Sequence, residues 1–175
     1  MFLGHTAGAG APREDAWMTM LHAGNGGMCF IDSVELDEIY TPIHVQTRRL
    51  IADSEGAGRF RGAPGIEVEL RPVNCRMEAG FVADGNIHNP LGARGGEAAA
   101  KSDQFRRTRG GELERLDQCS QIWIEDGEAL VSIACGGGGY GDPKTRDPAR
   151  VLSDVREGQI GRAHVRTPVT CLSRM

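Results

Sequence analysis

Glycine is the residue that most constrains what this chain can fold into. Glycine accounts for 25 of the 175 residues, about twice the usual share, and residues 136–139 form its longest run. The runs are irregular, so the G-X-Y repeat of collagen is excluded. Because glycine has no Cβ atom, such runs favour loops and places where one stretch of backbone passes close to another. Hydrophobic residues make up 39% of the chain, which is enough for a core, so we expect a globular protein.

Composition and charge exclude several classes of protein. No apolar run approaches the roughly 18 residues that a membrane-spanning helix needs, and the first residues do not resemble a signal peptide, so we expect a cytoplasmic protein with no membrane partner. The net charge is −4 and no block of Lys and Arg is interleaved with aromatic residues, so we expect no nucleic-acid partner. The five cysteines are scattered without zinc-site spacing, which predicts reduced thiols and no metal site.

The last residues differ in composition from the rest of the chain. Residues 161–175 contain three arginines and no acidic residue, and residues 160–170 resemble the translation of a common DNA-sequencing adapter. We therefore expect residues 1–160 to be the natural protein and residues 161–175 to be a non-native tail produced by reading through that adapter. A natural basic tail is the alternative.

Short strands dominate the expected secondary structure. Residues 65–71 carry the clearest signal, because Ile66, Val68 and Leu70 alternate with charged residues in the period of two that marks a strand with one solvated face. Weaker strand signals, in which β-branched and polar residues mix, cover residues 29–36, 43–52 and 75–82.

Glycine-punctuated segments separate these strands. We expect loops at residues 54–65 and 84–96, where glycines recur every few positions. Residues 98–115 mix alanine with charged residues and contain Gly110-Gly111, a pair that breaks a helix. We expect this segment to lie on the surface.

A hairpin is expected in the last third of the chain. Two strand-like runs, residues 120–125 and 128–135, are separated by Asp126-Gly127. This dipeptide favours the type I′ turn of a two-residue hairpin loop.

One helix is expected near the end of the chain. Asp147 provides the N-cap, Pro148 takes the first helical position and Gly158 ends the helix. Three residues are expected to face the body of the protein: Val151, Leu152 and Val155. Short antiparallel strands and hairpins, long glycine-rich loops and one late helix together predict a β-rich α+β fold.

Residues 136–141 match the GxGxxG pattern of dinucleotide-binding sites. Such a site needs a helix directly after the glycines, and Asp142-Pro143 prevents one from starting there. We therefore expect the run to let backbone pass close to other backbone or to a partner subunit, with substrate contact as the alternative. The residues of this substrate or interface loop are Gly136, Gly137, Gly138, Gly139, Tyr140 and Asp142.

Three further side chains are candidates for chemistry. His88 is the best single candidate for general acid–base catalysis, because imidazole titrates near neutral pH, although a solvated loop histidine is the simpler interpretation. Arg59 and Arg61 could hold a carboxylate or a phosphate, or could pair with acids such as Glu55. Since no GxSxG, HExxH or Walker A motif is present, the catalytic residues are otherwise unknown.

Several of these segments, taken in order, resemble the C-terminal region of the hydantoinase B/oxoprolinase family. They are GAGRFRG at residues 56–62 with the strand that follows, PLGARGG at residues 90–96, and GGGGYGDP at residues 136–143 with the capped helix. GGGGYGDP and its helix are the most specific part. The resemblance extends over nearly all of residues 4–159.

The resemblance implies that this chain is part of a larger domain. It implies a C-terminal fragment of a subunit of an ATP-dependent cyclic-amide hydrolase, of the hydantoinase or 5-oxoprolinase type, acting with a hydantoinase A-like partner. A fragment of a metal-binding ketone carboxylase alpha-type subunit, or a non-catalytic subunit-interaction module, are the alternatives. ATP and a divalent metal are implied for the full assembly and neither for the fragment, because the family's metal-binding elements have no counterpart in this sequence. We therefore expect the fragment alone to be inactive.

Overall fold

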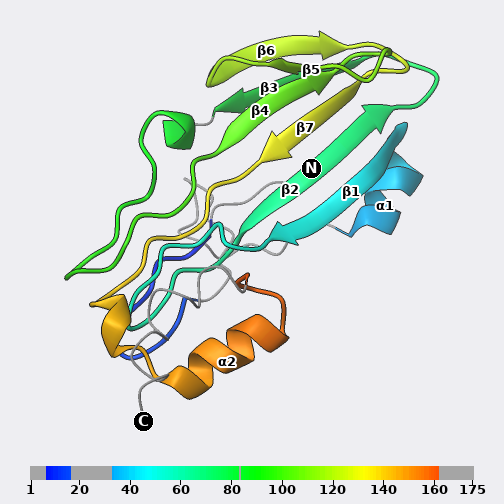
Figure 1. Ribbon diagram of the computed structural model, residues 1–175. Helices are drawn as coiled ribbons and strands as arrows, with labels where there is room; N and C mark the ends of the chain where they lie inside the picture. Colours follow the sequence, from blue (N-terminus) through cyan, green and yellow to red (C-terminus); the bar gives the residue numbers. More distant parts are fainter. Residues whose placement is uncertain (1–6, 17–32, 83, 162–175) are drawn as a thin grey trace.

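The fold is a β-rich α+β arrangement, as predicted (Figure 1). The computed structural model describes residues 7–16, 33–82 and 84–161. Within them the elements are α1 (Val34–Tyr40), β1 (Ile43–Ile51), β2 (Gly65–Pro72), β3 (Met77–Val82), the 3-10 helix η1 (Asp84–Asn86), β4 (Asp103–Arg107), β5 (Leu113–Arg115), β6 (Cys119–Ile124), β7 (Ala129–Ile133), the 3-10 helix η2 (Pro143–Thr145) and α2 (Pro148–Arg156). The predicted tail lies outside the described residues except for Gly161, whose N–H donates to Asp53 Oδ1 at 2.6 Å.

The strands form two antiparallel sheets. The larger sheet has the order β1-β2-β7-β4-β5, and the smaller sheet is a ribbon of β3 and β6. The core lies where β1 and β2 face this ribbon: Ile66, Val68 and Leu70 of β2 are buried with Ile43 of β1, and Met77 of β3 packs against them. Strand β2 therefore confirms the predicted alternation of apolar residues.

The other face of β2 is more buried than the sequence predicts. Glu69 is only 8% exposed, and its carboxylate accepts hydrogen bonds from Arg107 of β4 at 2.7 and 3.0 Å. The expectation of a solvated face was wrong at this position, because β7 and β4 extend the sheet beyond β2 and bring a long arginine side chain over it.

A helix replaces part of the strand expected at residues 29–36. Residues 34–36 lie in α1, and residues 29–32 lie outside the described residues. Acidic residues in its first turn, Glu35 and Asp37, favour a helix start through the helix dipole. Pro42 follows directly after the C-cap Thr41. A proline disfavours the helical conformation in the residue before it, so the helix ends here. The acidic residues of the first turn favoured a helix more than the β-branched residues favoured the predicted strand.

The hairpin expected across Asp126-Gly127 does not form. The turn is present, since Glu128 N–H donates to the Glu125 carbonyl at 2.9 Å and Gly127 has φ 85°. Asp126 is not among the described residues with positive φ, so this is not a type I′ turn. Strand β6 pairs with β3, whereas β7 pairs with β2 and β4. The chain therefore crosses from one sheet to the other at this turn.

Residues 98–115 form strands rather than an irregular surface segment. Strands β4 and β5 pair antiparallel around a turn that contains Gly110 and Gly111. The expectation that no helix forms here is confirmed, but the surface location was wrong for Ser102 and Gln104, which are both 5% exposed. Gln104 is the buried residue of β4, a strand that lies between β7 and β5.

Helix α2 has the predicted ends. Asp147 Oδ1 accepts the N–H of Ala149 at 2.9 Å, and Gly158 has φ 71°, a conformation that favours glycine after a helix. Val151 is buried as expected, but Leu152 is 50% exposed and Asp154 is buried in its place. Residues 151 and 154 lie three positions apart, on one face of the helix.

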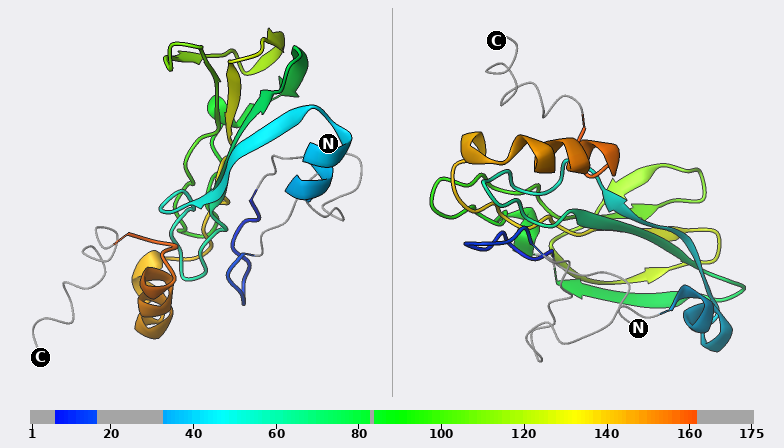
Figure 2. Two further views of the ribbon diagram at one scale, coloured as in Figure 1. Left: turned by 90° about the vertical axis from the view of Figure 1, so that its right-hand side faces the viewer. Right: turned by 90° about the horizontal axis from the view of Figure 1, so that it is seen from below.

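Extended segments without ladder pairing connect the sheets to α2 (Figure 1). Residues 8–10, 54–63, 91–97 and 136–141 lie side by side, and we call them the glycine bundle. Each of the first three segments is joined to the fourth by backbone hydrogen bonds: Gly10 N–H to the Gly138 carbonyl at 2.8 Å, Gly56 N–H to the Gly137 carbonyl at 2.8 Å, and Ala93 N–H to the Gly139 carbonyl at 2.9 Å. Both views in Figure 2 place α2 alongside these segments.

Candidate functional site

The centre of the glycine bundle has room only for glycine. A Cβ atom on each of residues 136–139 would lie far inside van der Waals contact of a backbone carbonyl oxygen. The oxygens concerned belong to Ser54, Gly8, Leu91 and Ala57, in that order. All four glycines are buried, and three different segments of the same chain supply these contacts. Backbone therefore passes close to backbone here, as the run of glycines indicated; contact of this loop with substrate or a partner stays a prediction.

Tyr140 and Asp142 continue the run at the edge of the bundle. Tyr140 exchanges two backbone hydrogen bonds with Phe60, at 2.8 and 3.0 Å, and its side chain is half-buried. Asp142 is exposed, and its carboxylate accepts the N–H of Lys144 at 2.9 Å, which caps η2. The segment after the glycines is thus a three-residue 3-10 helix, without the long helix of a dinucleotide site.

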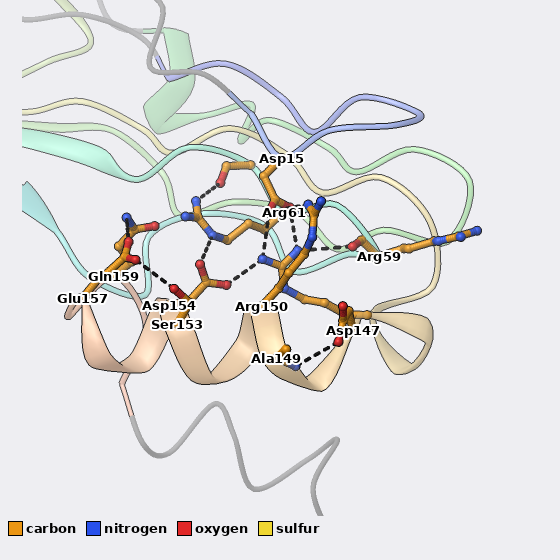
Figure 3. A network of polar contacts seen from close by, with 12 residues as sticks. Asp15, Arg59, Arg61, Asp147, Ala149, Arg150, Ser153, Asp154, Glu157 and Gln159 are labelled. Atoms are coloured by element: carbon orange, nitrogen blue, oxygen red, sulfur yellow. Dashed lines mark hydrogen bonds and ion pairs between the residues drawn. The ribbon is translucent and has the colours of Figure 1, made fainter.

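An ion-pair cluster joins the bundle to α2 (Figure 3). Asp154 of α2 bridges two guanidinium groups: its Oδ1 lies 3.0 Å from Arg61 Nε and its Oδ2 lies 2.6 Å from Arg146 Nη2. Asp15 of the N-terminal segment pairs with Arg146 and also lies 3.1 Å from Arg150 Nη1. We call these five residues the arginine–aspartate cluster.

Burial strengthens the electrostatic interactions within this cluster. The side chains of Arg61, Arg146 and Asp154 are 12%, 7% and 8% exposed, so water screens their charges little. Burial alone would raise the pKa of Asp15, but hydrogen bonds from the Arg146 side chain and from the backbone N–H of Arg61 outweigh it and lower that pKa. The arrangement fixes α2 against the bundle. Moving α2 away would take Asp154 from its two arginines and leave buried charges without a partner, which is strongly unfavourable.

The two arginines proposed as anion contacts have different surroundings. Arg61 pairs with Asp154 rather than with Glu55. The guanidinium of Arg59 lies 5.6 Å from the centroid of the Phe60 ring. The fold thus brings both arginines to the edge of the bundle near Tyr140, which pairs with Phe60 between them.

His88 lies apart from these groups along the chain. It is exposed in the segment after η1, outside the bundle segments and the cluster. The structure therefore supplies no acid or base partner from the cluster for the histidine that the sequence favoured.

Sequence reasoning missed Asp15, Arg146 and Asp154 as partners of Arg61. Arg61 and Asp154 are 93 positions apart, and Arg146 and Asp15 are 131 apart, so no local pattern joins them. One signal was available: Asp154 shares a helix face with Val151, and a carboxylate on an inward face needs a buried cation.

Neither metal ligation nor membrane insertion is evident in residues 7–16, 33–82 and 84–161. No group of three or more His, Cys, Asp or Glu side chains in these ranges is placed to hold a metal ion. Neither helix that the structure describes has the length and apolar composition needed to cross a bilayer.

Comparisons with known proteins identify relatives of this chain. The beta chain of caprolactamase from Pseudomonas jessenii is 32% identical over 159 residues, which cover 88% of this chain and 27% of that protein. A putative D-/L-hydantoinase component, of the B type, from Pseudomonas sp. strain NS671 is 29% identical over 131 residues, covering 73% of this chain and 22% of that protein. The chain thus spans about a quarter of the length of these curated relatives.

A solved structure and a family model agree with these matches. The crystal structure of ATP-dependent caprolactamase from Pseudomonas jessenii has the same fold, with a TM-score of 0.71 at 24% identity over 89% of this chain and 28% of that one. The model of the family described as hydantoinase B/oxoprolinase matches residues 1–143. A family match over most of the chain, with the glycine run inside it, leads to one conclusion: the chain belongs to the hydantoinase B/oxoprolinase family.

Proposed function

We propose that this chain is part of a subunit of an ATP-dependent hydrolase that opens a cyclic amide, of the hydantoinase or 5-oxoprolinase type. The observation that supports the proposal is the 32% identity, over 159 residues, with a protein named as a caprolactamase subunit. A relative named as a hydantoinase subunit supports the same class of reaction, since caprolactam and hydantoin rings both contain an amide bond.

The role that we propose for the described residues is to hold a rigid platform. The glycine bundle is closed by hydrogen bonds within the chain, and the buried guanidinium groups of Arg61 and Arg146 pair with Asp154 of α2. Such a platform can fix the orientation of neighbouring catalytic elements without itself supplying a nucleophile. The chain alone is therefore expected to show no turnover.

We further propose that ATP and a divalent metal act in the full assembly and that a hydantoinase A-like subunit is the partner. The described residues do not fit a metal site, because they contain no group of three suitable ligands. We propose that other parts of the assembly hold the metal and the nucleotide, as the family resemblance implies. Both relatives above are named as subunits, which supports a requirement for a partner chain.

Reconstitution of the whole enzyme tests this proposal. The subunit that contains this sequence is combined with its partner, Mg-ATP and a panel of hydantoins, 5-oxoproline and caprolactam, and ring-opened product and ADP are measured together. ADP release coupled to opening of one ring supports the proposal. ATP hydrolysis that no cyclic amide stimulates contradicts it, and bicarbonate-dependent consumption of a ketone would assign a carboxylase instead.

A binding assay separates the platform from an interface role. The chain is immobilised and the partner subunit is passed over it. Saturable binding would assign an interaction surface to these residues, whereas no binding by a folded chain would limit their role to support within their own subunit.

A further inference from the structure

Helix α1 has one apolar face, and that face is exposed. Leu36, Ile39 and Tyr40 are 52%, 73% and 79% exposed, and positions i, i+3 and i+4 lie on one side of a helix. We call these three residues the α1 face. Val73, which is 40% exposed, lies close to the end of the helix, because its N–H donates to the Pro42 carbonyl at 2.9 Å. No residue of α1 is buried.

The opposite side of α1 is held to β1 by polar contacts. Glu38 Oε1 accepts the N–H of Val45 at 2.8 Å and lies 2.9 Å from Nδ1 of His44. Position 38 is two residues from positions 36 and 40, and so lies on the opposite side of the helix. The α1 face is therefore directed away from β1, the strand beside α1 in Figure 1.

Local interactions alone give α1 little stability. It has seven residues, whereas an isolated helix shorter than about 12–15 residues is marginal in water. Acidic residues favour its first turn, but the N-cap Ser33 makes no side-chain cap hydrogen bond and the last turn has no basic residue. Most helices in proteins are stabilised by packing of an apolar face. The α1 face is thus suited to pack against a further surface.

We propose that the α1 face docks on an apolar surface of its own subunit, in the part that lies outside this chain. The chain covers 27% of the caprolactamase beta chain and 28% of the solved caprolactamase chain, so most of the length of these relatives is available to cover it. Large apolar side chains suit a contact that forms as the subunit folds, because interfaces between separately folded subunits are no more apolar than the rest of the surface. This docking rests on the proposed function only in taking the chain as part of a longer subunit.

Amide hydrogen exchange in α1 tests the docking. Exchange is measured at the amides of Asp37 and Thr41, which donate to the carbonyls of Ser33 and Asp37, in the 175-residue chain and in the full-length subunit that contains it. Docking buries large apolar side chains, so the protection factors are expected to be higher in the full-length subunit by about tenfold or more. Equal protection in the two proteins would overturn the proposal.

A variant of the α1 face separates docking from the stability of the helix itself. Glutamine forms helices at least as well as isoleucine, so Ile39→Gln removes apolar surface without weakening α1. We expect this variant to lower α1 protection by about tenfold or more in the full-length subunit and to change it less than about twofold in the 175-residue chain. Ile39→Leu keeps the apolar surface and is the matched control, which should behave like the wild type in both proteins.

A loss of the same size in both proteins, or a loss in neither, would overturn the docking. The comparison of the two wild-type proteins needs no variant, so it remains decisive if Ile39→Gln does not fold.

Other occupants of the α1 face would give different results. Protection that appears only when the partner subunit is added would assign the face to that subunit, and protection that rises with the concentration of the 175-residue chain would assign it to a second copy. Either result overturns the proposal. Ring opening is assayed on the same preparations after reconstitution with the partner and Mg-ATP. Turnover with an unprotected α1 would contradict the docking alone, whereas a protected α1 without turnover would contradict the proposed reaction alone.

Discussion

Replacing Gly138 by alanine should disrupt the centre of the glycine bundle. The new Cβ atom would lie 2.7 Å from the carbonyl carbon of Leu91 and 3.1 Å from the backbone nitrogen of Gly92. These are backbone atoms, so no side chain can rotate away. The carbonyl of Gly138 also accepts a hydrogen bond from Gly10 N–H at 2.8 Å, which joins this segment to residues 8–10 of the bundle. Relief therefore requires whole segments to move apart.

The magnitude can be worked from these contacts. Overpacking costs about 1–3 kcal/mol where neighbours can adjust, and separating the segments forfeits hydrogen bonds worth about 1 kcal/mol each. Alanine restricts the unfolded chain and offsets about 0.4–1 kcal/mol. The net loss in the free energy of unfolding is about 2–4 kcal/mol, which lowers Tm by about 4–16 °C for a chain of this size.

Thermal and urea unfolding of Gly138→Ala beside Gly80→Ala measures this effect. Gly80 lies in β3, has no atom within 4 Å of an added Cβ and has no positive φ, so the control variant should stay within about 0.5 kcal/mol of the wild type. If the two variants unfolded at the same temperature, the steric account of the glycine run would be refuted.

Three further outcomes are expected. Asp154→Asn leaves two buried guanidinium groups without their shared carboxylate and should cost about 3–5 kcal/mol in urea unfolding; an effect below about 1 kcal/mol would show that the cluster is not what fixes α2. Ile124→Ala, at a position with 0% exposure, should cost about 2–5 kcal/mol, whereas Leu152→Ala, at 50% exposure, should cost much less; equal losses would contradict the burial described for α2. Because the folded-state pKa of Asp15 is lowered from 3.8, its contribution to stability is complete above about pH 4 and is lost as the pH falls through the lowered value. Asp15→Asn should flatten the stability profile in that acidic range, and an unchanged profile would count against the contribution of Asp15.

Much of the fold could be predicted because its signals are local. Helix α2 is defined by an N-cap, a proline and a terminal glycine that all lie within twelve consecutive residues, 147–158. Strand β2 shows its alternation within eight residues. Each signal acts through the backbone preferences of neighbouring residues, so it needs no knowledge of the rest of the chain. The family resemblance rested on similarly short segments and is confirmed over residues 1–143.

Predictions failed where several local outcomes were compatible with the sequence. Asp126-Gly127 does form a turn, but β6 and β7 separate into different sheets. The strand expected at residues 29–36 gave way to α1, because Glu35 and Asp37 stabilise a first helical turn that an apolar count does not register. Strand pairing with distant parts of the chain decided the first case, and helix-end electrostatics decided the second.

The candidate site divides in the same way. The sequence by itself determined that residues 136–139 carry no side chains and that Arg61 is a cation in a glycine-punctuated segment. Only the tertiary structure decided that three other segments close around that run, that Asp154 lies 3.0 Å from Arg61 across 93 positions of chain, and that Glu55 is buried. The physical reason is that backbone preference acts between neighbours, whereas exclusion of water acts on whichever groups the completed fold brings together.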